Sequence, residues 1–430
     1  MRSSALLLAS LLAGTASPHA VATPTSLTAT MQAAADNTRV QAARWRAQAA
    51  DATARAAWRG SWAPSLDLQA QAARRDQLST IDTPAGAFTL GDRDVYEATL
   101  SLRQPLLDLS NQAYGAPASQ RVAQAQHQQV LRQQRVQAAA AASHYLDWLA
   151  LEAQRQAILS LQDSLQLRAA RVRNQSTAGR ALQADVLDMD VAVTEARQQL
   201  VEIEAQQTVL RQDLTRLTGR PIQPQDTRPP DDAADHLQTP DWAEVFAQRR
   251  DLQALRLQRD SQRLLASAER ASAWPTLGAA VSVVRSQGNP FTPEDDVRVG
   301  LNLQWQPFTS GRIQAQRQAA ESHSSALDAD IQQLQAAIRV EIAQAQASIR
   351  TAISLAELAQ SAVAASKASR QVRVARYEAG RATVDEVLDA EATYARQRAQ
   401  AASAGYRLRS AVIEHRLATG APLFTDTAAD

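Results

Sequence analysis

The feature that most constrains the fold of this chain is an internal duplication. Four short motifs occur twice in the same order, at offsets of 211, 202, 201 and 201 residues. The pairs are Trp62-Ala63-Pro64-Ser65-Leu66 with Trp274-Pro275-Thr276-Leu277, Gln104-Pro105-Leu106 with Gln306-Pro307-Phe308, Ala178-Gly179-Arg180-Ala181 with Ala379-Gly380-Arg381-Ala382, and Val186-Leu187-Asp188 with Val387-Leu388-Asp389. Four matches in a constant order at a nearly constant offset indicate two structural repeats in tandem.

Each repeat contains two segments in which apolar and polar residues alternate. The apolar positions are Leu66, Leu68, Ala70 and Ala72, then Tyr96, Ala98, Leu100 and Leu102 in the first repeat, and Leu277, Ala279, Val281 and Val283, then Val297, Val299, Leu301 and Leu303 in the second. A period of two predicts β-strands with one face in an apolar medium. We expect strands at about 64–73, 94–104, 276–285 and 296–306, paired as hairpins and long enough to cross a bilayer.

Four tryptophans flank the predicted strands: Trp58, Trp62, Trp274 and Trp305. Aromatic residues at strand ends form girdles at the two interfaces of a membrane, so these side chains are candidates for membrane-interface aromatics. The alternative role for each of them is to anchor a protein core.

After each hairpin the pattern becomes helical. Leu151, Ile158, Leu165 and Val172 recur at a spacing of seven, and the run 312–378 contains neither glycine nor proline. Helices this long need partners along their length in water, and heptads with abundant alanine predict antiparallel coiled coils. Gly179 and Gly380 are expected to end the long helices in a left-handed turn that reverses the chain.

The predicted fold class is mostly α with a small β part, in two tandem repeats that each combine a β-hairpin with long antiparallel coiled-coil helices. The expected divisions are a signal peptide at 1–22, a first repeat at 23–220, a linker or equatorial segment at 221–240, a second repeat at 241–420 and a C-terminal tail at 421–430. In the first repeat we expect helices at about 25–59, 113–176 and 183–218. In the second repeat we expect helices at about 241–272, 312–378 and 384–419.

Residues 1–22 have the pattern of an export signal. Arg2 precedes the apolar stretch 6–12, and Ala20-Val21-Ala22 supplies the small residues that signal peptidase accepts. No later run reaches the roughly 18 apolar residues of a membrane-spanning helix, so strands would have to span any membrane. Four strands cannot close a barrel, and an open sheet leaves backbone groups unsatisfied in lipid. Two copies would supply eight strands, and three copies would supply twelve.

The composition excludes several other functions. The 45 basic and 44 acidic residues leave a net charge of +1, so nothing favours nucleic acid, and there is no cysteine for a disulfide or a lipid anchor. The histidines lie far apart, and no catalytic, phosphate-binding or metal-binding motif occurs. We therefore expect no enzyme activity, no metal and no cofactor. The competing hypothesis is a soluble periplasmic coiled-coil scaffold, which the need for detergent would test.

The most specific segment of the chain is Tyr377-Glu378-Ala379-Gly380-Arg381-Ala382-Thr383-Val384-Asp385-Glu386-Val387-Leu388-Asp389-Ala390. Together with the duplicated strand openings and exits, it resembles the TolC-like outer-membrane efflux family (outer membrane factors). The resemblance covers essentially the whole mature chain. The resemblance implies a homotrimer with a 12-stranded outer-membrane β-barrel over a periplasmic α-helical barrel. It also implies a passive exit duct of a tripartite efflux or type I secretion system, with a periplasmic adaptor (membrane fusion protein) and an inner-membrane pump as partners. The cargo is not indicated.

The resemblance also implies roles for residues near the two predicted helix reversals. It places Glu386 and Asp389 in a ring of carboxylates at the pore constriction, although the family usually has aspartate at the first position. Asp185 and Asp188 are the corresponding pair of the first repeat. The ordinary alternative for all four is stabilisation by the helix dipole. Gly179, Arg180, Gly380 and Arg381 are the candidates for adaptor docking, and the alternative for the glycines is helix reversal alone.

Overall fold

The computed structural model describes residues 23–84, 86–225, 236–289 and 293–423. The predicted signal peptide lies outside them. The chain divides into two compact units. Unit 1 comprises Met1–Asn37, Gln137–Ala233 and Ile349–Ile413, and unit 2 comprises Thr38–Val136, Ala234–Ser348 and Glu414–Asp430. Helices α3 (Ala116–Thr177) and α7 (Arg312–Glu378) contribute residues to both units. Within the described ranges, no helix combines the length and the apolar composition needed to cross a membrane.

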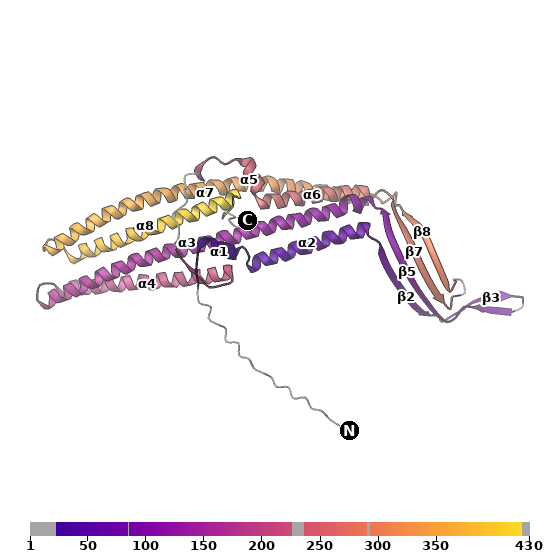
Figure 1. Ribbon diagram of the computed structural model, residues 1–430, viewed down its shortest axis with the longest axis horizontal. Coiled ribbons are helices and arrows are strands. Elements are labelled where there is room, and N and C mark those ends of the chain that lie inside the picture. The colour runs from indigo at the N-terminus through magenta and orange to yellow at the C-terminus, as the bar shows by residue number, and fades with distance from the viewer. Residues whose placement is uncertain (1–22, 85, 226–235, 290–292, 424–430) are drawn as a thin grey trace, which may run out of the picture. The chain divides into compact units, whose positions relative to one another are not determined.

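Unit 2 contains a four-stranded antiparallel sheet with the order β2-β5-β7-β8 (Figure 1). Its strands are β2 (Ser65–Arg74), β5 (Asp94–Leu107), β7 (Thr276–Gln287) and β8 (Asp295–Gln304). The sheet joins one hairpin from each repeat, because β5 pairs with β7. Opposite residues such as Leu68 and Leu100 lie on the same face, so all four strands present their apolar residues on one side.

The segment between β2 and β5, which is rich in Asp, Thr, Pro and Gly, is not a simple loop. It carries a second hairpin, formed by β3 (Ser79–Thr83) and β4 (Gly86–Leu90). Strands of five residues are too short for a period-two pattern to be recognised among threonines and glycines. Strand β5 also continues beyond its expected end, with an irregularity in its pairing to β7 between Pro105 and Leu107.

Two expected helices are each broken in two. The range 25–59 forms α1 (Leu27–Ala34) in unit 1 and α2 (Thr38–Trp62) in unit 2, separated by a turn in which the Asn37 side chain donates to the side-chain oxygen of Gln137 on α3 at 2.9 Å. The range 241–272 forms α5 (Trp242–Gln248) and α6 (Arg250–Ala271) of unit 2, with Arg249 in an extended conformation between them. A π-helical turn, η1 (Ser110–Gly115), precedes α3, where Pro117 lacks the N–H that would extend the α-helical ladder backwards.

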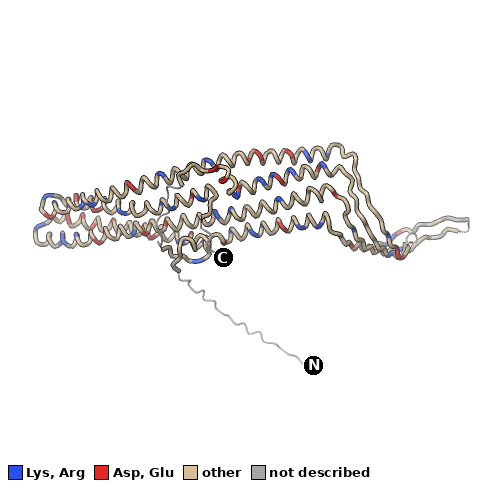
Figure 2. The backbone as a smooth tube through the Cα atoms, turned by 45° about the horizontal axis from the view of Figure 1, so that its top comes forward, with Lys and Arg blue, Asp and Glu red and all other residues tan. Residues whose placement is uncertain are grey.

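Unit 1 is built from two helical hairpins. The distal part of α3 pairs with α4 (Gln183–Thr218), and the distal part of α7 is followed by α8 (Val384–Thr419). Apolar residues spaced three and four apart on α3 and α4 form one buried stripe. Its members are Ile158, Leu161, Leu165, Ala169 and Val172 on α3, and Val186, Met189, Val193, Ala196, Leu200 and Ile203 on α4. Charges of both signs are interspersed along the helices (Figure 2).

The chain beyond α4 returns to pair with the start of the described residues. Strand β1 (Thr23–Thr25) runs parallel to β6 (Ile222–Pro224). The buried Tyr145 of α3 holds this pair, because its hydroxyl lies 2.8 Å from the Thr25 carbonyl oxygen and accepts the N–H of Gln225 at 2.9 Å. The predicted linker thus begins as an ordered strand.

Glu152 of α3 gives unit 1 a defined dependence on pH. Arg155 donates two hydrogen bonds to its carboxylate, at 2.9 and 2.8 Å, and Gln207 of α4 donates a third at 3.0 Å. The hydrogen bonds from Arg155 are the largest cause that lowers the pKa of Glu152 from 4.5 to about 2. Because the folded pKa is depressed, this stabilisation is complete above about pH 4.5 and is lost as the pH falls towards 2.

We therefore expect Glu152→Gln to lower the stability of unit 1 at neutral pH, and the difference from wild type to shrink on acidification through this window. Unfolding followed by far-UV circular dichroism at several pH values measures both quantities. Glu195→Gln, which changes an exposed carboxylate of α4, serves as the control and should leave stability unchanged at every pH. A Glu152→Gln deficit that stays constant down to about pH 2 would contradict the assignment.

Candidate functional site

The two helical hairpins of unit 1 end in the same turn. Gly179, with φ of 69°, donates to Ser176 at 2.9 Å while Arg180 donates to Gln175 at 2.8 Å. In the second hairpin, Gly380, with φ of 68°, donates to Tyr377 at 2.9 Å while Arg381 donates to Arg376 at 2.8 Å. Positive φ and this bond from the second residue beyond the helix are the features of a Schellman cap, which requires glycine. The turn geometry thus explains both glycines.

The turn does not explain the arginine that follows each glycine. Arg180 and Arg381 are exposed, and neither side chain forms a hydrogen bond or ion pair with the described residues. Only their backbone N–H groups take part in the cap. Each tip therefore presents one uncommitted guanidinium group to solvent.

The four candidate carboxylates follow these turns and differ in what they contact. The Asp185 carboxylate accepts the backbone N–H of Leu182 at 3.2 Å, so it caps the start of α4. Burial raises the pKa of the Tyr377 hydroxyl on α7, and the charge of Asp185 raises it further. The carboxylates of Asp188, Glu386 and Asp389 make no hydrogen bond or ion pair within the described part of the chain. Helix capping thus explains the position of Asp185. It does not explain Asp188, Glu386 or Asp389, whose carboxylates stay without a partner in the described chain.

Glu386 and Asp389 lie one turn apart near the start of α8. Residues three apart on a helix are neighbours on its surface, so both carboxylates can point to the same side. Asp389 is exposed and Glu386 is half-buried. The backbone N–H of Glu386 lies 3.4 Å from the hydroxyl of Thr383, which precedes α8 as Leu182 precedes α4 in the first repeat. The second repeat therefore caps α8 without using either acid.

A buried ionic cluster behind the tips was not anticipated. The Glu391 side chain is 2% exposed; Arg168 of α3 lies 2.9 Å from its Oε1, and Arg370 of α7 donates to its Oε2 at 3.2 Å. The Arg370 guanidinium also lies 4.7 Å from the centre of the Tyr394 ring. The cluster connects both hairpins. Its sequence signal is a charge at a heptad core position, since Val384, Val387, Glu391 and Ala395 follow spacings of three and four.

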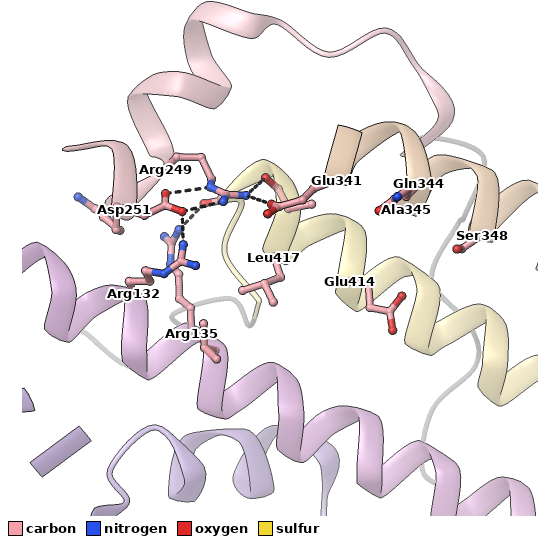
Figure 3. Close-up of a pocket in the computed structure, with 14 residues that line it drawn as sticks. Arg132, Arg135, Arg249, Asp251, Glu341, Gln344, Ala345, Ser348, Glu414 and Leu417 are labelled. Carbon is pink, nitrogen blue, oxygen red and sulfur yellow. Dashed lines mark hydrogen bonds and ion pairs between the residues drawn. The ribbon is translucent and has the colours of Figure 1, made fainter. Parts of the chain in front are cut away.

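Unit 2 has a second ionic cluster, at the break between α5 and α6 (Figure 3). Arg249 is 5% exposed and lies 2.7 Å from each of Asp251, Glu341 of α7 and the carbonyl oxygen of Ala418 on α8. Arg132 of α3 also pairs with Asp251, and Arg135 donates to the carbonyl of Gly420. These residues line a cavity of about 420 Å³. Because its charges are paired with one another, the cluster serves to join four helices.

Three of the four candidate tryptophans lie where helices meet the sheet of unit 2. Trp62 ends α2, Trp274 lies between α6 and β7, and Trp305 follows β8 and donates its indole N–H to the carbonyl of Ala273 at 3.1 Å. All three are exposed. Trp58 does not lie at a strand end, because α2 continues to Trp62 and places Trp58 one helical turn earlier. Within the described residues, no group of three or more histidines and acids could hold a metal ion.

Known structures share this architecture. The outer membrane protein VceC from Vibrio cholerae is 16% identical, with a TM-score of 0.77 over 93% of this chain and 97% of its own. The Campylobacter jejuni CmeC outer membrane channel is 15% identical, with a TM-score of 0.78 over 92% and 85%. The open state of the Neisseria gonorrhoeae MtrE outer membrane channel is 17% identical, with a TM-score of 0.76 over 94% and 91%. At these identities the likeness concerns the fold.

No curated protein sequence matches the chain significantly. The sequence model of the outer membrane efflux protein family matches residues 30–220 and 243–421. The two matched ranges are the two repeats, and they include both tips and all four strands of the large sheet. The family expectation is confirmed, as are the mostly helical fold with a small β part and the location in the outer membrane. The chain belongs to the outer membrane efflux protein family.

Proposed function

We propose that three copies of this chain form an outer-membrane exit duct, with twelve pooled strands as a barrel in the membrane and the helices as a periplasmic α-helical barrel. Substrates delivered by an inner-membrane pump and a periplasmic adaptor pass through it passively. The observation that carries the proposal is the exposed apolar face of the four-stranded sheet. On β8 alone, Val297, Val299, Leu301 and Leu303 are between 66% and 77% exposed. Continuous apolar surface of this kind marks contact with lipid or protein.

The limits of this face fit a membrane. At one end of the strands lie Trp62, Trp274 and Trp305. At the other end, an arginine and an aspartate stand opposite each other on the apolar side of each hairpin, Arg74 with Asp94 at 3.6 Å and Arg285 with Asp295 at 3.7 Å. An apolar band about 25 Å tall between an aromatic girdle and charged residues is typical of outer-membrane strands.

The sheet is open in a single copy. Strands β2 and β8 each have one edge without a partner in the described structure. An unpaired edge in lipid leaves backbone N–H and C=O groups unsatisfied, at several kcal/mol each. Because the four strands alternate in direction, β8 of one copy and β2 of another are antiparallel when the sheets are joined. A ring of copies would satisfy both edges.

Oligomeric state in detergent tests this proposal against the soluble scaffold. We expect the protein to require detergent and to have the native mass of three chains. A monomer that stays soluble without detergent would leave no role for the apolar face and would favour the scaffold.

We further propose that Glu386 and Asp389 form the narrowest, negatively charged part of the duct. Three copies would bring together about six carboxylates, a ring that favours cations. Glu386→Ala with Asp389→Ala should enlarge the current through the channel and reduce its cation selectivity. The reversal potential in a salt gradient, measured in planar lipid bilayers, reports selectivity.

Asp185→Ala with Asp188→Ala is the matched control from the first repeat, and we expect it to retain cation selectivity. If this pair instead abolished selectivity while the α8 pair had no effect, the constriction would belong to α4.

The exposed Arg180 and Arg381 are proposed to dock the periplasmic adaptor. Two observations support this proposal. Neither guanidinium group has a partner in the described chain, and the same turn carries an arginine in both repeats. Arg180→Ala with Arg381→Ala should reduce co-purification of the adaptor while leaving the trimer intact. If the double variant co-purifies with as much adaptor as wild type does, neither arginine takes part in docking.

A further inference from the structure

The two hairpins of the sheet have the same internal register once the duplication is applied. In the first hairpin Leu68 lies opposite Leu100, and in the second Ala279 lies opposite Leu301. Adding 211 to each residue number of β2 and 201 to each residue number of β5 converts every pair of the first hairpin into a pair of the second. The offset of 211 is that of the strand-opening motif, and 201 is the offset that aligns the alternating residues of β5 with those of β8; the exit motif Gln104-Pro105 is offset by 202, so one extra residue follows β8.

The junction between the two hairpins is staggered. Arg103, which pairs with the first residue of β2, lies opposite Ala280 rather than opposite Thr276, where β7 begins. A sheet closes into a barrel only if its strands are staggered in this way. The junction joins the second strand of one repeat to the first strand of the next repeat.

The two open edges of the sheet belong to the same two kinds of strand. By the duplication, β8 is the equivalent of β5, and β2 is the equivalent of β7. Joining β8 of one copy to β2 of the next copy therefore repeats, between copies, the junction that β5 and β7 form within one copy. The structure already shows what this kind of junction looks like.

We propose, resting on the trimeric duct above, that β8 pairs with β2 of the next copy in the register of β5 and β7. Each pair between copies follows from an observed pair of β5 and β7. Adding 201 to the number of the β5 residue gives the β8 residue, and subtracting 211 from the number of the β7 residue gives its partner on β2 of the next copy. The observed pair Ser101 and Ser282 becomes Asn302 opposite Gln71 of the next copy. The observed pair Leu100 and Val283 becomes Leu301 opposite Ala72 of the next copy.

Other registers are less consistent with the chain. A shift by one residue would place the apolar residues of β8 and β2 on opposite faces of the sheet, which a membrane does not tolerate. A shift by two preserves the faces, so hydrophobicity alone does not choose among the even shifts. The blunt alignment, with Asp295 opposite Arg74, fills both strands but removes the stagger at every junction between copies, so only the β5–β7 junctions would tilt the strands. The duplication selects one register because it reproduces an observed junction.

Disulfide trapping tests the register directly, because the chain contains no cysteine and the introduced thiols are the only ones. Asn302→Cys with Gln71→Cys should give covalently linked trimers on oxidation in outer membranes. Ser101→Cys with Ser282→Cys is the matched control within one chain, because it bridges an observed pair of the same type without linking copies. Two further variants combine Asn302→Cys with Gln69→Cys or with Ala73→Cys.

These last two pairs are displaced by two residues, so their Cα atoms would be about 7–8 Å apart, at the limit of disulfide geometry. We expect them to form roughly tenfold less linked product than Asn302→Cys with Gln71→Cys. If either displaced pair links faster, the proposed register is wrong, although the copies still join through these edges.

If the control within one chain forms its disulfide but no tested pair links copies, β8 and β2 do not pair in this register, whatever the native mass. The duct itself is tested separately, because a monomeric native mass contradicts it without reference to any disulfide. A failure of the register and a failure of the proposed function are therefore distinguishable.

Discussion

Replacing Glu391 by glutamine is expected to destabilise the helical hairpins of unit 1 by about 3–5 kcal/mol, because it leaves two arginines partly buried without a counter-charge. The carboxylate is 2% exposed, and the side chains of Arg168 and Arg370 are 20% and 29% exposed. Glutamine preserves the shape of the side chain, so the loss measures the charge. Unfolding in urea followed by far-UV circular dichroism gives the free energy of unfolding.

An exposed ion pair between the same two helical hairpins provides the matched control. Arg171 of α3 lies 3.2 Å from Glu378 of α7, and both side chains are more than half exposed. Glu378→Gln should cost at most about 1 kcal/mol. Adding Arg168→Met and Arg370→Met to Glu391→Gln should recover much of the lost stability, since apolar residues remove the unpaired charges. If Glu391→Gln and Glu378→Gln lower the free energy of unfolding by the same small amount, the buried cluster stabilises unit 1 no more than an exposed ion pair does.

Replacing Arg249 by methionine is the second change with a large expected effect, again about 3–5 kcal/mol, this time in unit 2. The side chain fills a buried position and bonds three partners on three segments. Burial alone would raise the pKa of Asp251, but its bonds to Arg249 and the charge of Arg132 outweigh burial and lower that pKa. Without Arg249, the Asp251 carboxylate and the end of α8 both lose their main donor.

Thermal unfolding of the Arg249→Met variant measures this effect, and Arg317→Ala is its control. Arg317 forms an exposed pair with Glu321 on α7, at 2.7 Å, and its loss should cost less than about 0.5 kcal/mol. Because Asp251 has a depressed pKa, its contribution is present above the unfolded pKa and disappears as the pH falls. We therefore expect the gap between wild type and Arg249→Met to narrow in acid. A variant as stable as wild type would mean that the break at Arg249 is held by packing alone.

Much of the fold follows from periodicity and duplication. The heptad residues Ile158, Leu165 and Val172 are buried, because a sustained spacing of seven can only be satisfied by a partner helix. Both long helices stop beside Gly179 and Gly380, the positions at which the backbone needs a positive φ. The strands likewise follow from alternation, which reports directly on a sheet with one apolar face.

The parts that the sequence does not reveal depend on tertiary contacts. Arg249 interrupts a good helical pattern because two of its partners, Glu341 and Ala418, lie on α7 and α8, which no local window contains. Trp58 was expected at a strand end and lies within α2, because the helix continues through Gly60 to Trp62. The roles of Glu386 and Asp389 depend on neighbouring copies of the chain, so they stay predictions.

Electrical recording tests the central claim most directly. Protein purified from outer membranes is added to a planar lipid bilayer, and the current is measured in a salt gradient. A duct with a ring of carboxylates predicts small, discrete currents that favour cations. If trimeric protein inserts and carries no current under any applied voltage, or if the chain remains a detergent-free monomer, it does not form the duct proposed for it.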